Sequence, residues 1–375
     1  MTIAINCWVL RNKQIDGIGY FTINTLQKVI ANNPEVNFII LCDKNFTEPY
    51  FDFKNVTLKK VFPPYRHPLL YIFYMEFVLP FVLGRIKPDL FVSAEGFLSL
   101  LSSCKQLPII HDLNFEHYPE NIALKNRLYF RFFFKRFARK AIRIATVSEY
   151  SKADIVHLYK IAPEKIDTVY CGINSNFYVL SDTEKTESRL RYSEGCPYFF
   201  FVGSMLPRKN VLRLLQAFNE FKKQSNSNFK LVIAGAMVWS GSEIKEVHEA
   251  SPYKNDIHFV GRLSDEELKQ ALGAAYALTF VPIFEGFGIP VVEAFEAGVP
   301  VLASNATSLP EVAGDAAVYA DPFDITSIAT GMAQLYENKD GLCASLIEKG
   351  FQQKKLFSWD KTAGLLWASI QKAIK

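Results

Sequence analysis

The chain alternates between two kinds of segment along most of its length. One kind is a short, nearly continuous apolar run, which is typical of a strand buried in a parallel sheet. The other is a longer segment whose apolar residues recur at helical spacing. This alternation predicts an α/β protein with parallel sheets. The apolar runs lie at residues 3–9, 38–42, 90–93, 107–110, 144–147, 166–170, 198–202, 230–234, 258–260, 278–283 and 300–303.

One segment interrupts this alternation. Residues 176–197 are polar and charged and show no sustained apolar period. Because 375 residues exceed what a single core usually supports, two domains are expected. We predict a first domain over residues 1–178, a linker over 179–196, a second domain over 197–357 and a final helix over 358–375.

Composition narrows the classes of function. The net charge of +4 is too small to indicate nucleic-acid binding. None of the six cysteines forms a close pair with metal or redox spacing, so we expect reduced thiols in a cytosolic protein and no metal site. The N-terminus lacks the basic start and long apolar run of a signal peptide. The most apolar window, residues 68–83, is too short to span a bilayer and carries Glu76.

The most informative stretch begins with the apolar run 278–283. A turn with two glycines follows, from Glu285 to Gly288, and Pro290 then stands where a helix can begin. A strand, a glycine turn and a helix N-terminus together make an anion site, because amides and the helix dipole favour negative charge there. Glu285 and Glu293 beside such a site would repel a phosphate, so we interpret them as acceptors for sugar hydroxyls. A nucleotide sugar offers both groups.

In these residues the chain resembles the retaining glycosyltransferases of family 4, which have the GT-B fold. The family signature is a pair of glutamates separated by seven residues, which Glu285 and Glu293 match within EGFG-P-x-x-EA. An ordinary strand–helix crossover with surface glutamates would explain a lone pair, but the ordered series favours the family. The series continues through Gly298-Val299-Pro300-Val301, Pro310-Glu311-Val312, Gly314-Asp315-Ala316-Ala317 and Asp321-Pro322.

The resemblance covers nearly the whole chain and implies its architecture. Two Rossmann-like domains are expected to face a cleft, with the acceptor bound by the first and the nucleotide sugar mostly by the second. The last helix, from Lys361, would cross back onto the first domain.

The resemblance also implies which residues bind the donor. Lys209 matches the family lysine that binds the diphosphate, and Arg208 stands beside it. Many relatives have an arginine where this chain has Ser204, so two alternatives stay open: a phosphate clamp with less charge, or one in which Arg208 supplies the missing charge. Cations at a helix start would otherwise oppose the dipole. Glu285 would hold the sugar and Glu293 the ribose. The remaining donor-binding positions are Phe287, Gly288, Ile289 and Arg262, of which Arg262 could reach the base or the diphosphate.

In the first domain, Gly17 and Gly19 match the glycine loop whose amides face the donor phosphates in the family. Glycines after a first strand also suggest a dinucleotide-binding domain, but the third glycine of that fingerprint is missing and the loop is too long. His111 and Asp112 end a predicted strand and match a stretch at the edge of the acceptor site. They would orient the acceptor or stabilise the reacting sugar. A helix cap by Asp112 and a buried histidine are the alternative.

Residues 125–143 predict a helix with eight basic residues. Five of these follow at spacings of four and share one face, next to an apolar face. Two interpretations stay open: a face that meets an anionic membrane, or a solvated face whose phenylalanines pack in the domain. The five basic residues are Arg127, Arg131, Lys135, Arg139 and Arg143.

The sequence therefore predicts a metal-independent, retaining hexosyltransferase that uses no cofactor. The HDL…PE and PRKN segments resemble the mannosyltransferase branch, which favours GDP-mannose as donor. The acceptor would be a saccharide or a lipid-linked saccharide in surface polysaccharide or lipopolysaccharide synthesis, at the inner face of the membrane. A nucleotide-sugar epimerase on the same fold and a non-catalytic partner subunit are the alternatives.

Overall fold

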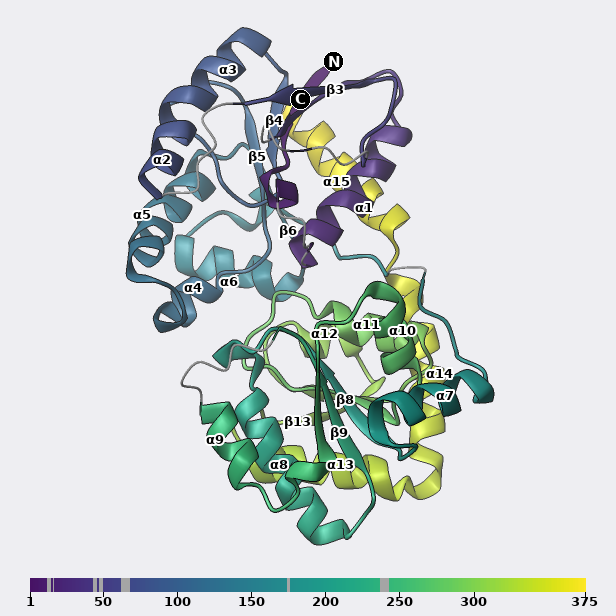
Figure 1. Ribbon diagram of the computed structural model, residues 1–375. Coiled ribbons are helices and arrows are strands. Elements are labelled where there is room, and N and C mark those ends of the chain that lie inside the picture. The colour runs from purple at the N-terminus through teal and green to yellow at the C-terminus, as the bar shows by residue number, and fades with distance from the viewer. Residues whose placement is uncertain are drawn as a thin grey trace. The chain divides into compact units, whose positions relative to one another are not determined.

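The computed structural model describes residues 1–11, 15, 17–42, 46, 50–61, 68–173, 176–236 and 243–375. The chain forms two compact units, each built around its own sheet (Figure 1). Unit 1 contains residues 1–172 and 358–375, and unit 2 contains residues 173–357. The prediction of an α/β protein with two parallel sheets is confirmed.

The sheet of unit 1 has seven parallel strands in the order β3-β2-β1-β4-β5-β6-β7. Its central strands are buried along their whole length because helices cover both faces. The chain leaves β1 in one direction for β2 and returns to its other side for β4, so the order reverses between β1 and β4. The strands are β1 (Thr2–Asn6), β2 (Asn37–Cys42), β3 (Val56–Lys60), β4 (Leu90–Ser93), β5 (Gln106–Ile110), β6 (Ile144–Thr146) and β7 (Ile166–Thr168).

Helices lie on both sides of this sheet (Figure 1). Helices α1 and α15 lie together on one side, and α2, α3 and α5 lie on the other. A π-helical turn, Tyr74–Val78, joins α2 to α3. A mixed aliphatic and aromatic core, which includes Trp8, Tyr74, Phe134 and Phe137, packs beneath the second group. The helices are α1 (Gly17–Ala31), α2 (Pro68–Phe73), α3 (Leu79–Ile86), α4 (Asn114–His117), α5 (Leu124–Lys140), α6 (Glu149–Tyr159) and α15 (Trp359–Ile374).

The C-terminal helix α15 is part of unit 1. Lys28 of α1 pairs with Asp360 at 2.7 Å, and Thr362 donates a hydrogen bond to the carbonyl of Tyr170. A Cβ at Gly172 would come within 2.4 Å of the backbone nitrogen of Trp359, so only glycine permits this close approach. The helix therefore closes the first unit from the far end of the chain.

The sheet of unit 2 has six parallel strands in the order β10-β9-β8-β11-β12-β13. Here the order reverses between β8 and β11. The phenylalanines of β8 are buried and pack against α8, as at Phe199 and Phe221. The strands are β8 (Tyr198–Val202), β9 (Lys230–Ala234), β10 (Ile257–Gly261), β11 (Ala277–Phe280), β12 (Val301–Ser304) and β13 (Ala317–Ala320).

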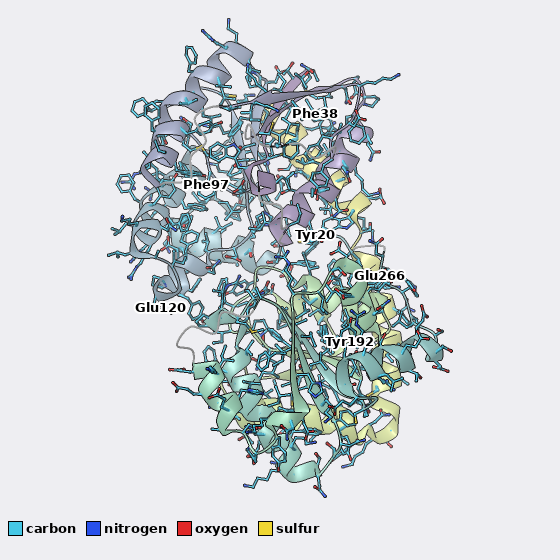
Figure 2. The ribbon with its side chains drawn as sticks, in the orientation of Figure 1. Tyr20, Phe38, Phe97, Glu120, Tyr192 and Glu266 are labelled. Carbon is cyan, nitrogen blue, oxygen red and sulfur yellow. The ribbon has the colours of Figure 1, made fainter. Side chains whose placement is uncertain are left out.

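Two helical layers cover this second sheet. Helix α8 packs against α9 and α13, while α11 packs against α12 and α14, and side chains fill the space between helices and sheet (Figure 2). In the part of the chain that the structure describes, no helix is long and apolar enough to cross a membrane. The helices are α7 (Asp182–Ser193), α8 (Val211–Ser225), α9 (Glu243–Ala250), α10 (Asp265–Gly273), α11 (Ile289–Glu296), α12 (Leu309–Ala313), α13 (Ile325–Glu337) and α14 (Leu342–Gln353).

The segment predicted as a linker, residues 179–196, is different in the structure. It forms helix α7, which belongs to unit 2 and packs against α10. Ser181 and Glu184 make a capping box at its start, a local signal that stabilises a helix without any apolar stripe. The prediction of a linker from the polar composition was therefore wrong. A polar segment can form a helix here because its cap and a few contacts with unit 2 hold it.

The basic helix also differs from its prediction. Helix α5 ends at Lys140, and Arg143 lies beyond it. The Arg143 guanidinium binds both oxygens of Asp167, at 2.7 and 2.9 Å, so it is an internal ion pair. The predicted face of five basic residues is therefore reduced to the four that lie within α5.

Candidate active site

The candidate site in unit 2 lies at the carboxyl edge of the sheet, where β8 and β11 are neighbours. Open α/β sheets bind ligands at this edge, at the point where the strand order reverses. Two loops leave the sheet here. Residues 203–210 follow β8 and contain Arg208 and Lys209, and residues 281–288 follow β11 and contain Glu285.

Backbone and side-chain bonds join the two loops. The amide of Ile283 donates to the carbonyl of Arg208 at 2.8 Å. Asn210 is buried, and its side-chain amide donates to the carbonyls of Val281 and Pro322, at 2.9 and 2.7 Å. The backbone of Asn210 is left-handed, with φ of 65°, a conformation that asparagine tolerates better than most residues. Asn210 thus sets where the preceding cations lie.

The structure brings Lys209, Arg208 and Glu285 together. Lys209 Nζ donates to Glu285 Oε2 at 2.6 Å, and Arg208 Nη1 donates to the same oxygen at 3.2 Å. Arg208 Nη1 also reaches the carbonyl of Phe284 at 3.3 Å. Lys209 Nζ lies 5.3 Å from the ring centre of Phe280, within the range of a cation–π contact.

This cluster keeps Glu285 ionised. Burial by itself would raise the pKa of Glu285, but the charges of Lys209 and Arg208 outweigh it and hold the pKa below its usual value. Two cations and one carboxylate leave one positive charge in excess. Among the described residues, Arg208 Nε and Nη2 and Glu285 Oε1 have no partner, so the cluster has donors and an acceptor available for a ligand.

Hydrogen bonds from the loop after β12 hold the glycine turn that follows Glu285. Ser308 is fully buried, and its hydroxyl donates to the carbonyls of Glu285 and Phe287, both at 3.0 Å. Gly288 has φ of 103°, and a Cβ there would lie 2.4 Å from Leu309 Cδ2. The turn therefore requires glycine at this position, and helix α11 begins at the next residue.

Helix α11 begins at Ile289, with Pro290 in its first turn as predicted. Amides at a helix start have no intrahelical acceptor, and the dipole makes this end positive. Glu293 lies on the same helix and is half-buried. Burial, and less strongly the charge of Asp265, raises the pKa of Glu293 to about 8. No hydrogen bond or ion pair reaches this carboxyl group from the described residues, so it can receive a hydroxyl.

The other predicted donor-binding residues of unit 2 differ in how deeply they are buried and in where they lie. Phe287 is buried and packs edge-on against Phe357, with ring centres 5.4 Å apart, so it supports the turn from inside. Ile289 is half-buried at the helix start. Arg262 is exposed and follows β10, the edge strand, on the same edge of the sheet as the cluster.

Unit 1 contains the other predicted site residues. Gly17 and Gly19 were expected in a loop before the first helix, but α1 begins at Gly17 and both glycines form its first turn. The loop was expected because the family has a glycine loop at this point. The low helix propensity of glycine is a weak preference, and tertiary packing overrides it here. Two residues further on, Phe21 packs edge-on against His111 at 5.1 Å, so α1 lies against the end of β5.

His111 and Asp112 follow β5 and are both half-buried. His111 Nε2 lies 2.9 Å from the carbonyl of Ala94, an arrangement in which Nε2 carries the proton. One carboxylate oxygen of Asp112 accepts bonds from the amide and the side chain of Asn114, at 2.9 and 2.5 Å. Asp112 thus binds the first residue of α4, although the N-cap position itself is Leu113, and the role of Asp112 towards an acceptor stays a prediction.

Two buried polar residues of unit 1 were missed in the sequence. Asn6 ends β1 and Ser93 ends β4, and the two are register partners where the strand order reverses. Both are almost fully buried, and within the part of the chain that the structure describes no hydrogen-bond partner reaches the side-chain amide of Asn6 or the hydroxyl of Ser93. A polar residue closing an apolar run was the signal available for both.

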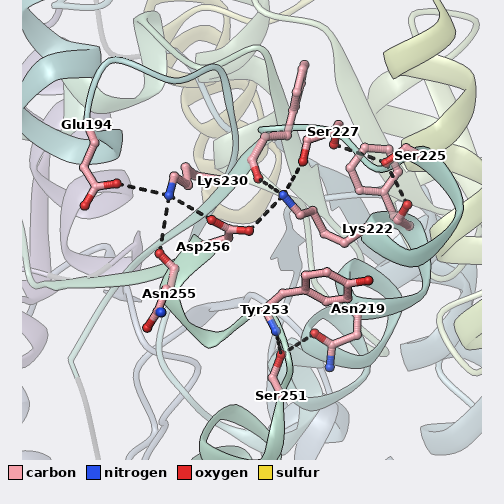
Figure 3. Close-up of polar contacts among 12 residues, drawn as sticks. Glu194, Asn219, Lys222, Ser225, Ser227, Lys230, Ser251, Tyr253, Asn255 and Asp256 are labelled. Carbon is pink, nitrogen blue, oxygen red and sulfur yellow. Dashed lines mark hydrogen bonds and ion pairs between the residues drawn. The ribbon is translucent and has the colours of Figure 1, made fainter.

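A second group of charges lies at the opposite edge of the sheet of unit 2 (Figure 3). Lys222 and Lys230 both bind Asp256, each at 2.8 Å, and Lys230 also binds Glu194 at 3.1 Å. Within the described residues no group of histidine, cysteine or acidic side chains could hold a metal ion.

Two family descriptions match the chain. The one named Glycosyltransferase Family 4 matches residues 15–177, and the one named Glycosyl transferases group 1 matches residues 182–353. Together these two ranges take in most of the chain: the first covers most of unit 1 and ends shortly after its boundary at residue 172, and the second lies within unit 2.

Individual proteins agree with this assignment. The O-antigen chain mannosyltransferase B of Escherichia coli is 32% identical over 218 residues, which cover 58% of this chain and 57% of that one. The O-antigen chain mannosyltransferase RfbU of Salmonella typhimurium is 27% identical over 233 residues, covering 62% and 61%. The chain thus spans about three fifths of the length of these relatives.

The fold of a solved structure is also similar to that of this chain. The crystal structure of Anabaena HepE in complex with UDP and glucose superposes with a TM-score of 0.77 at 15% identity, covering 99% of this chain and 100% of that one. From the two matched descriptions and this shared architecture, the chain belongs to the family 4, group 1 glycosyltransferases and has their GT-B fold.

Proposed function

We propose that this protein transfers a hexose from a nucleotide sugar to a hydroxyl group of an acceptor. The observation that carries the proposal is the cluster of Lys209, Arg208 and Glu285 at the carboxyl edge of the second sheet. Its excess positive charge and the start of α11 suit a diphosphate. Its unpaired carboxylate oxygen suits a sugar hydroxyl. A nucleotide sugar carries these two groups side by side.

The charges of the cluster suit the chemistry of the transfer. When the bond between the anomeric carbon and the phosphate oxygen breaks, the departing diphosphate gains negative charge. Lys209 and Arg208 are already in place to stabilise that charge, and preorganised charges of this kind act most strongly in the transition state. Glu285 would hold the transferred sugar through Oε1, and Glu293 would hold the ribose.

We propose GDP-mannose as the donor, because both O-antigen relatives are mannosyltransferases by name. HepE was crystallised with UDP, so a uridine donor is the natural competitor. Calorimetric titration with GDP and UDP tests the base, and release of GDP from GDP-mannose tests the sugar. Tight binding of UDP without binding of GDP would contradict the proposal.

The proposed reaction retains the anomeric configuration. His111 and Asp112 would orient the acceptor or stabilise the positive charge that develops on the sugar, and Gly17 and Gly19 would contribute amides to donor binding. Proton NMR of slow donor hydrolysis reports the outcome directly. Retention releases the α anomer of mannose first, whereas inversion releases the β anomer. A new nucleotide sugar formed from donor alone would instead indicate an epimerase.

For the acceptor, we propose a saccharide or lipid-linked saccharide of a surface polysaccharide or lipopolysaccharide, at the cytoplasmic face of the membrane. The names of the O-antigen relatives support this class. The basic residues of α5 support the location, because each lysine or arginine near an anionic leaflet contributes about 1 kcal/mol.

Vesicle sedimentation tests the membrane contact by charge. We expect binding to anionic vesicles that weakens with salt and is lost when Arg131, Lys135 and Arg139 are all changed to Gln. Binding that is equal on anionic and neutral vesicles would contradict an electrostatic contact.

A further inference from the structure

An exposed apolar stripe runs along the helical segment from α2 to α3. Four large apolar side chains, spaced three or four residues apart, are between 44% and 60% exposed: Leu70, Phe73, Phe77 and Phe81. Phe73 and Phe77 stack on each other with ring centres 5.5 Å apart. Single exposed apolar residues are ordinary, but a row of them on one helix face indicates a binding surface.

Helix α5 carries a second stripe of the same kind. Leu124, Leu128 and Phe132, at spacings of four, are between 52% and 65% exposed. Helix α5 packs against α2 on the same side of the unit (Figure 1). We call the exposed stripes of both segments the aromatic–basic face.

A chain of ring contacts joins helix α5 to helix α2. Phe132 packs against Phe133, which stacks on Tyr129 at 4.6 Å. Tyr129 in turn packs edge-on against Tyr71 of α2, with ring centres 5.5 Å apart. The two helices that carry the stripes are therefore packed against each other through aromatic side chains.

The charge on the aromatic–basic face is of one sign. Helix α5 contains seven basic residues and no acid. In the segment from α2 to α3 the one acid is Glu76, which is buried. Its carboxylate accepts bonds from the amides of Leu100 and Leu101, at 3.1 and 3.0 Å, so it is used inside the unit.

Arginines lie over the exposed rings. The Arg85 guanidinium is 4.2 Å from the ring centre of Phe81, and that of Arg136 is 3.7 Å from the ring centre of Phe132. Such pairs hold a cation directly beside an apolar group. The headgroup layer of an anionic bilayer offers matching partners at the same depth, anionic groups for the cations and acyl chains for the rings.

We propose that the aromatic–basic face inserts its phenylalanines into an anionic lipid bilayer. An acidic protein surface would match the cations, but it would not bury two rows of separate protruding rings. This inference adds to the membrane contact proposed above, which depends on charge alone, and it does not depend on which sugar is transferred. It makes unit 1 a membrane-inserted domain rather than one held only by counter-charge.

The first test compares sedimentation with vesicles of phosphatidylglycerol and phosphatidylcholine. Changing Phe77→Ser and Phe81→Ser together should weaken binding by about tenfold or more, because the apolar surface that the bilayer would bury is lost. The matched control is Leu190→Ser with Leu356→Ser in unit 2, whose side chains are 64% and 56% exposed. The control should bind as the unchanged protein does, and urea unfolding should be unchanged for both variants.

The second test measures whether residue 77 enters the bilayer. Phe77→Trp introduces an indole whose emission should shift to the blue on vesicles and be quenched by brominated phosphatidylcholine. Salt-sensitive binding without quenching, and without any effect of the serine changes, would leave only electrostatic contact and overturn the insertion. Loss of a dimer in light scattering on making the serine changes, with no vesicle binding by the unchanged protein, would show that the face meets a second copy instead.

Discussion

Two groups of charges in unit 2 use the same chemistry at opposite edges of one sheet. At the amino edge, Lys222 and Lys230 share the carboxylate of Asp256. At the carboxyl edge, Arg208 and Lys209 share the carboxylate of Glu285. In each case two cations converge on one acid: Lys222 of α8 and Lys230 of β9 at the amino edge, and two consecutive residues of one loop at the carboxyl edge.

The two groups differ in how completely their hydrogen bonds are satisfied. Lys222 Nζ also donates to the carbonyls of Ser227 and Phe229, so all three of its donors are used. Lys230 Nζ bonds Asn255 and Glu194 besides Asp256, and Glu194 balances the remaining positive charge. At the carboxyl edge no second acid balances the charge among the described residues, and two nitrogens of Arg208 lack a partner.

This difference separates a structural ion pair from a binding site. A saturated group contributes to stability and has nothing left for a ligand. A group with excess charge and unused donors costs stability unless an anion completes it, and this is the pattern expected where binding occurs. The contrast predicts that mutations at the two edges affect different quantities.

The largest effect is expected from Lys209→Ala. The change removes the proposed contact to the departing diphosphate and should lower kcat/KM by about 30- to 1000-fold, which corresponds to about 2–4 kcal/mol of transition-state stabilisation. The free energy of unfolding should change little, because Glu285 keeps Arg208. GDP release from GDP-mannose and urea unfolding measure the two quantities. Near-normal turnover would show that the phosphate site lies elsewhere.

Lys222→Met should show the opposite behaviour. It leaves two carbonyls and part of Asp256 without partners in a nearly buried position, so the free energy of unfolding should fall by about 2–3 kcal/mol. At a temperature where the variant is folded, kcat/KM should stay within about twofold of the original, because distant sites act independently. If Lys222→Met lost activity but not stability, the distinction between the two edges would be wrong.

Glu293→Gln should change how donor binding depends on pH. The pKa of Glu293 in the folded protein is about 8, above its ordinary 4.5, so at neutral pH the carboxyl is largely protonated before a ligand binds. If Glu293 holds the ribose as proposed, the ribose hydroxyls donate more strongly to its ionised form, so GDP affinity should rise severalfold from about pH 6 to about pH 8 and then level off. Calorimetry of both proteins isolates this effect, since the titration of GDP itself is common to them.

The raised pKa of Glu293 also makes the free energy of unfolding depend on pH, and the direction of that dependence is defined. Between the ordinary pKa of 4.5 and the folded value of about 8, the unfolded chain has released the proton while the folded chain retains it. The contribution of Glu293 to stability is therefore complete below the lower value and is lost as pH rises through the upper one. Identical pH dependence of stability in the Gln variant would contradict the raised pKa.

The smallest effect is expected from a chelator. If positive side chains rather than a metal ion stabilise the diphosphate, EDTA should leave the rate of GDP release unchanged. Loss of activity that a divalent ion restores would show that the charges at the carboxyl edge are insufficient alone.

The sequence by itself determined the elements and the order of the motifs. Strands such as β4, β8 and β9 have the bounds that their apolar runs predict, because a strand covered on both faces must be apolar throughout. The turn at Gly288 and the proline at the start of α11 were also predictable, because each depends on the conformational limits of one residue.

Only the tertiary structure decided which of these side chains meet. Lys209 and Glu285 are 76 positions apart, and their contact depends on β8 and β11 being neighbours in the sheet. The removal of Arg143 from the basic face depends in the same way on Asp167, in a different strand. Sequence periodicity reports which face of an element is apolar, but not which other element covers it. The packing of one element on another decides which side chains are buried, which charges pair and which hydrogen-bonding groups have no partner. These properties therefore appear only in the folded chain.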